Sequence, residues 1–182
     1  MASHFNAMSM ASECIDEYLL AARICLDARK EDGGCYGYPA ALMLFCITEA
    51  IGRSLKHQPV TIDGGTQNIT DGEPFRVLND QLFGLTLTGK QIKNLENLFR
   101  NGLAHNAYIN PNSLMTDSTE GPPFHFSKDD VQIRLGSFYQ LVEKAWKDFD
   151  KRRLPDWKDS QDTKIRSGNQ TTIIVGSTAA NH

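Results

Sequence analysis

Three polar residues with complementary chemistry lie close together in the middle of the chain. Arg100, Asn101 and His105 fall within residues 100–105. A histidine titrates near neutral pH and can therefore move protons. An arginine is always charged, and its planar guanidinium matches the oxygens of a phosphate group. An asparagine can orient either the histidine or the phosphate through its amide. Together these residue types fit the cleavage of a phosphodiester bond.

Cleavage of RNA by its own 2′-hydroxyl group makes three demands. It needs a proton acceptor near the 2′-oxygen, positive charge at the phosphate and a proton donor for the leaving oxygen. In this hypothesis His105 is the general base or acid, Arg100 binds the phosphate and Asn101 supports the geometry. The chemistry needs no metal, and the sequence contains no evident cluster of metal ligands, so we predict neither a metal nor a cofactor.

The spacing of these residues constrains how a site could form. Five residues of a regular helix correspond to a rotation of about 140°, so Arg100 and His105 would not share a face. Gly102 could let the helix bend. Alternatively, two copies of the segment could meet across a two-fold axis and complete one site.

The same residues also have a purely structural explanation. An arginine after an amphipathic helix can neutralise the negative end of the helix dipole. A histidine beside glycine and alanine can cap the last carbonyl groups of a helix. In that case neither Arg100 nor His105 has a special role, and the chain is a plain helical interaction protein.

The arrangement Arg100-Asn101, then three residues, then His105 resembles the motif of the HEPN superfamily. The resemblance extends over residues 9 to 150, but only these residues are specific to the motif. It implies an all-α fold and a composite site at the interface of a homodimer. It also implies a metal-independent endoribonuclease that cleaves single-stranded RNA, as in toxin–antitoxin and defence systems. The alternative is a non-catalytic module that binds RNA, a nucleotide or a partner protein.

An antitoxin or regulator protein is a further partner that the resemblance suggests. In one toxin subgroup a tyrosine stands two residues after the histidine and is modified with AMP by the antitoxin. Here Ala107 occupies that position, and Tyr108 follows one residue later. We therefore do not expect that mode of control.

Hydrophobic periodicity predicts the elements that hold the segment. The predicted fold is all-α, a HEPN-like bundle of about five helices with two long polar loops and a C-terminal tail. The expected helices cover residues 9–30, 39–55, 75–83, a segment capped at Thr88 that leads into residues 100–105, and residues 127–151. The loops cover residues 58–74 and 110–123. We predict a domain over residues 1–154 and a flexible tail over residues 155–182.

Composition sets limits on the partners and on the compartment. The chain has 182 residues, 40% hydrophobic and 23% charged, with a formal net charge of -3. A broad nucleic-acid-binding surface is usually basic, so any RNA contact must be local. The longest apolar run, residues 40–47, is too short to cross a membrane. The N-terminus does not resemble a signal peptide, and four widely spaced cysteines fit a reducing compartment. We expect a cytoplasmic protein without membrane contact.

A few other polar residues have two explanations each. Glu49 is a carboxylate in an otherwise apolar helix, and we expect it to face a groove or pair with an arginine rather than to catalyse. We expect His57 to be a surface group at a helix end, and His125 to point outward from an extended stretch. Arg53, Lys56, Lys90 and Lys93 could border an RNA groove or could simply be solvated.

Overall fold

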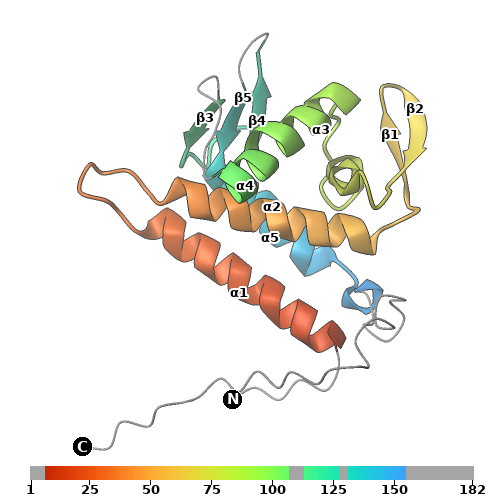
Figure 1. Cartoon of the computed structure of the whole chain (residues 1–182), viewed down its shortest axis with the longest axis horizontal. Coiled ribbons are helices and arrows are strands. Elements are labelled where there is room, and N and C mark those ends of the chain that lie inside the picture. The colour runs from red at the N-terminus through yellow and green to blue at the C-terminus, as the bar shows by residue number, and fades with distance from the viewer. Residues whose placement is uncertain (1–6, 107–112, 128–130, 155–182) are drawn as a thin grey trace, which may run out of the picture.

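Two long helices begin the described chain. The computed structural model describes residues 7–106, 113–127 and 131–154. Helix α1 (Ala7–Asp27) and helix α2 (Gly37–Ser54) lie close to the ranges predicted from periodicity. Gly33, in the turn between them, has a φ of 83°. That left-handed backbone favours glycine, which has no Cβ. Helix α1 ends at Asp27, three residues before the predicted end at residue 30. Helices α1 and α2 lie side by side in Figure 1.

Helix α2 is the centre of the core, as its nearly continuous apolar sequence predicts. It packs against α1, against the last helix and against the segment that carries Arg100. Phe45 is fully buried, and its ring lies 5.9, 6.1 and 5.0 Å from the rings of Phe75, Phe99 and Phe138. Aromatic pairs at these distances stabilise a core beyond the area that they bury. The core therefore joins α2 to three other parts of the chain.

The remaining helices follow the predicted order with changes in type. The helix predicted over residues 75–83 is replaced by the shorter 3₁₀ helix η1 (Pro74–Asn79), and turns follow it. Helix α3 (Gly89–Leu95) begins with the predicted capping box: Gln91 N donates to Thr88 Oγ1, and Thr88 N donates to Gln91 Oε1. It continues into the π-helical turn η2 (Glu96–Asn101) and helix α4 (Gly102–Asn106). Helix α5 (Leu135–Asp148) and the 3₁₀ helix η3 (Lys151–Arg153) complete the described chain.

The all-α prediction is wrong, because the described residues also form five short strands, and the fold is mixed α/β. Strands β1 (Pro59–Ile62) and β2 (Gly65–Asn68) form an antiparallel hairpin inside the predicted loop 58–74. Its turn is Asp63-Gly64, with φ values of 53° and 77°. Two positive φ angles define the turn that suits the right-handed twist of paired strands, and Asp-Gly is a preferred sequence for it.

A second, three-stranded sheet replaces the start of the predicted last helix. Its central strand β5 (Val131–Arg134) pairs in parallel with β3 (Ser113–Thr116) and antiparallel with β4 (Phe124–Phe126). Val131 and Ile133 are buried and alternate with half-buried residues, which is the period of a strand. Helix α5 therefore begins at Leu135 rather than near residue 127. The sheet contacts helix α5 through strands β3 and β5, and Figure 1 shows its three strands.

Some predictions fall outside the described residues. They concern the predicted flexible tail over residues 155–182 and the positions of Ala107 and Tyr108. The domain boundary at residue 154 therefore stays a prediction. Within the described part of the chain, no helix has both the length and the apolar composition needed to cross a membrane.

Candidate functional site

The segment with Arg100 and Asn101 lies where α3 changes into a π-helical turn. Ile92, Leu95 and Phe99 are buried at helical spacing and hold this run of the chain against the core. In the turn η2 the backbone N–H groups bond to carbonyls five residues back, so the helix is locally wider than an α-helix. Single π-helical turns inside α-helices occur frequently at functional sites.

Arg100 reaches across to helix α2 and pairs with Glu49. Its Nε donates to Glu49 Oε2 at 2.9 Å, over a sequence separation of 51 residues. The other carboxylate oxygen of Glu49 accepts two hydrogen bonds from Arg53, at 3.1 Å from Nε and 2.8 Å from Nη2. One carboxylate thus holds two guanidinium groups. The expectation that Glu49 pairs with an arginine is confirmed.

The three charged side chains differ in how far they are buried. The side chain of Glu49 is 12% exposed, that of Arg100 is 27% exposed and that of Arg53 is 51% exposed. Burial alone would raise the pKa of the Glu49 carboxyl group, but hydrogen bonds from Arg53 and Arg100 outweigh it and hold the pKa below its ordinary value. Glu49 is therefore ionised at neutral pH, and the three groups carry a net charge of about +1.

Asn101 ties the guanidinium group to the helix that carries it. Arg100 Nη1 donates to Asn101 Oδ1 at 3.0 Å, and Asn101 Nδ2 donates to Asn97 Oδ1 at 3.4 Å. Neighbouring residues do not normally face each other on a regular α-helix. We attribute their meeting here to the wider π-helical turn together with the length of the arginine side chain. Asn101 thus orients Arg100, whereas the sequence suggested that it would orient the histidine or the phosphate; its role in a reaction stays a prediction.

His105 lies on helix α4, directly after this turn. Its backbone belongs to the described residues, and its side chain does not. The chain therefore brings Arg100, Asn101 and Glu49 together, and His105 follows within the next helical turn. Leu103, between them, is buried at 6% exposure and anchors α4 to the core.

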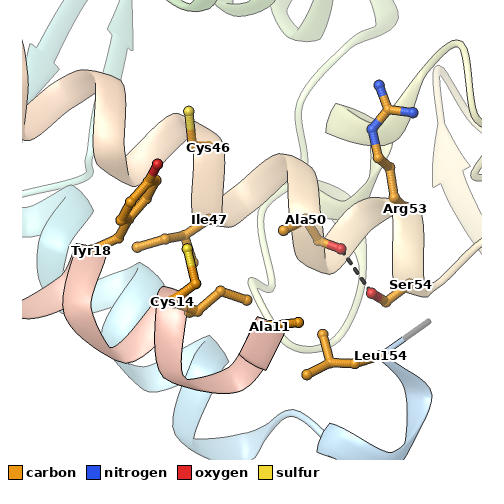
Figure 2. Close-up of a pocket in the computed structure, with 10 residues that line it drawn as sticks. Ala11, Cys14, Tyr18, Cys46, Ile47, Ala50, Arg53, Ser54 and Leu154 are labelled. Atoms are coloured by element: carbon orange, nitrogen blue, oxygen red, sulfur yellow. Dashed lines mark hydrogen bonds between the residues drawn. The ribbon is translucent and has the colours of Figure 1, made fainter. Parts of the chain in front are cut away.

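An apolar pocket of about 300 Å³ adjoins the charged groups. It lies between α1 and α2 and is shown in Figure 2. Cys14, Tyr18 and Ile47 line it, and Arg53 stands at its edge with the guanidinium directed away from the cavity. Burial, followed by the nearby Glu49 carboxylate, raises the pKa of the half-buried Cys46 thiol. Cys46 is therefore a poor nucleophile in this setting.

The other histidines and the possible metal ligands add little to the site. His57 is exposed just after α2, and His125 is exposed on β4, as expected for both. Sequence reasoning undervalued Arg53, which shares Glu49 with Arg100; its position four residues after Glu49 was the available signal. Within residues 7–106, 113–127 and 131–154, no group of three or more histidine, cysteine or acidic side chains is placed to hold a metal ion.

Comparisons of the chain with protein-family models, with curated proteins and with solved structures find no match.

Proposed function

We propose that the protein is a metal-independent endoribonuclease of HEPN type that cleaves single-stranded RNA through a site shared by two copies of the chain. The proposal rests on the local site and not on the fold class, since the mixed fold departs from the all-α bundle that the resemblance implied. One observation carries it. Arg100 is held in place by Glu49 and Asn101 immediately before His105.

A fixed guanidinium group is what phosphate recognition requires. A side chain that is already ordered loses less entropy when it binds, so its interaction with a phosphate is stronger. The ion pair and the hydrogen bond to Asn101 order Arg100 in this way. The net positive charge of Arg53, Arg100 and Glu49 also favours an anion. Together these features suit a phosphodiester group that gains charge in the transition state.

The reaction would proceed by transfer within the RNA. The 2′-oxygen loses its proton to one His105 imidazole and forms a bond to phosphorus. The bond from phosphorus to the 5′-oxygen breaks, and that oxygen takes a proton from the His105 of the second copy. Arg100 stabilises the charge on the phosphate oxygens. The products are a 2′,3′-cyclic phosphate and a free 5′-hydroxyl group.

A non-catalytic module that binds RNA is the second candidate, and one contact favours it. Glu49 occupies the Nε side of Arg100, so a phosphate must compete with a carboxylate that is ionised at neutral pH. A site of this kind can bind an anion weakly without promoting cleavage. Under this alternative His105→Ala would leave RNA binding largely intact.

Cleavage of mixed-sequence single-stranded RNA in EDTA tests the proposal. Wild type, His105→Ala and the matched control His125→Ala are compared, and the product ends are identified. His125 is an exposed histidine on β4, an element that contributes none of the residues assigned to the site. We expect wild type and His125→Ala to leave 2′,3′-cyclic phosphates and His105→Ala to be inactive. Equal cleavage by His105→Ala, or none by a folded wild-type dimer, would refute the nuclease. Light scattering on the same samples tests the dimer.

A further inference from the structure

A cluster of basic side chains extends from the Arg100 site toward the end of the described chain. We define the basic patch as the lysines and arginines at the C-terminal end of α2 and in η3. Its members are Arg53, Lys56, Lys151, Arg152 and Arg153. The two groups are nearly one hundred residues apart along the sequence, and the second is a run of three consecutive basic residues.

Two contacts bring the halves of the basic patch together. Arg153 Nη2 donates to Gln58 Oε1 at 3.4 Å, and Gln58 follows Lys56 by two residues. Leu154, next to Arg153, lines the same pocket as Arg53 and Ser54. Figure 2 shows Leu154 across from Ala50 and Ser54. The segment η3 therefore lies beside the end of α2.

The balance of charge makes this region unlike the rest of the protein. With Arg100 the basic patch contains six cations. Among the residues that the structure describes, four carboxylates contact these cations or the side chain beneath one of them, so these ten groups sum to six minus four, or +2, whereas the whole chain carries -3. These carboxylates are Glu49 beside Arg53, Asp71 beside Lys56, Asp150 beside Arg152, and Asp16, which accepts from Trp146 under the Lys151 ammonium group.

The basic side chains also remain accessible to a partner. Arg152 is 86% exposed although it pairs with Asp150, and Arg53 is half exposed. Surface ion pairs of this kind contribute little stability, so a phosphate can displace or share the cation at small cost. Along α2, Arg53 lies four residues after Glu49, which is about 6 Å at the helical rise per residue, and Lys56 follows the end of the helix. The patch is thus a path that leads away from Arg100.

We propose that the basic patch binds the sugar-phosphate backbone of the single-stranded RNA whose scissile phosphate lies at Arg100. The choice of RNA as the polyanion rests on the proposed function. The patch contacts phosphates and reads no sequence, so it supplies affinity and direction rather than specificity. It also meets the expectation from composition that any RNA contact in this acidic chain must be local.

The test measures binding separately from cleavage. A fluorescent 2′-O-methyl RNA of about twelve nucleotides has no free 2′-hydroxyl and cannot be cleaved, so its anisotropy reports binding by the full chain. The test variant is Arg152→Ser with Arg153→Ser. The control is Arg23→Ser with Lys144→Ser, two exposed cations that also pair with nearby carboxylates but lie on α1 and α5, outside the patch.

The size of the effect follows from counterion release. Each phosphate contact on a single strand contributes about 0.7 to the slope of log affinity against log salt. Losing two contacts should reduce the slope by about 1.4 and weaken binding about 25-fold at roughly 0.1 M salt. The control should keep the wild-type slope. Lys56→Ser provides a second variant at the other end of the patch and should reduce the slope by about 0.7.

Three results would overturn the proposal. They are an unchanged slope in the Arg152/Arg153 variant, an equal loss in the control variant, and wild-type binding that does not depend on salt. Cleavage of unmodified RNA is scored separately. If wild type fails to cleave but binds RNA through Arg152 and Arg153, the nuclease is wrong and the RNA-binding surface stands.

Discussion

Replacing Glu49 by glutamine tests whether this carboxylate positions Arg100. Glutamine keeps one oxygen that can accept from one arginine, but its other position becomes an amide N–H group that faces a donor of the second arginine. The negative charge is lost, and the Arg100 guanidinium is then held by its hydrogen bond to Asn101 without the ion pair to residue 49. We expect the change to weaken the hold on Arg100 while leaving helix α2 intact, because glutamine and glutamate have similar helix propensities.

The magnitude follows from the burial of the three groups. A hydrogen bond to a charged group contributes about 1.5–3 kcal/mol, and Glu49 and Arg100 are mostly buried. Arg53 is half exposed, so solvent screens its ion pair with Glu49, and this pair contributes little to stability. We expect the free energy of unfolding to fall by about 2 kcal/mol, which lowers the Tm by about 4–8 °C for a chain of this size.

The stability lost in Glu49→Gln should become smaller as the pH falls. The pKa of Glu49 is held below its ordinary value of 4.5 in the folded protein. The unfolded state therefore takes up protons first as the pH falls, and the stability that Glu49 contributes disappears through the folded pKa. The difference in free energy of unfolding between wild type and Glu49→Gln should be constant above about pH 6 and should shrink toward zero as the pH falls below about 4.5.

Thermal and urea unfolding followed by circular dichroism measure both effects. Glu143→Gln is the matched control, because Glu143 also accepts from a neighbour and pairs with a lysine four residues on, yet it is more exposed. We expect the control to lose less than about 1 kcal/mol. Two results would contradict a stabilising ion pair at Glu49. One is a Glu49→Gln protein as stable as wild type at neutral pH, and the other is a difference in free energy of unfolding that persists in acid. In the cleavage assay the same variant should lose activity if Glu49 positions Arg100.

Three further substitutions test the fold. Gly52→Ala would force a Cβ against the Pro74 carbonyl oxygen, so we expect the free energy of unfolding in urea to fall by more than about 3 kcal/mol. Gly72→Ala meets open space and should be nearly neutral. Thr88→Ala removes the capping box and should cost about 1 kcal/mol by the same assay, and Thr88→Ser should restore most of it. Phe45→Ala leaves a cavity among three aromatic rings and should cost about 3–5 kcal/mol, measured as a lower urea midpoint.

Local signals explain which parts of the fold could be predicted. The apolar residues of the long helices α1 and α2 recur at helical spacing over several turns. The capping box at Thr88 depends on residues that lie within four positions of the sequence. The strands are three or four residues long, too short for a clear alternation. The Asp63-Gly64 turn is a usable signal for the hairpin that pairs Val60 with Gln67, although strands this short resemble a polar loop in the sequence.

In the candidate site, too, some features follow from nearby residues and others depend on tertiary packing. A single carboxylate in an apolar helix predicts a charged partner, because an isolated buried charge is too costly. The identity of that partner depends on packing: Arg53 is one helical turn away, but Arg100 comes from a segment 51 residues later. The π-helical turn has no signature in the sequence, and it brings Arg100 and Asn101 to face each other. The sequence therefore indicated which side chains were chemically capable, and the tertiary structure decided that Arg100 is a fixed cation rather than a solvated one.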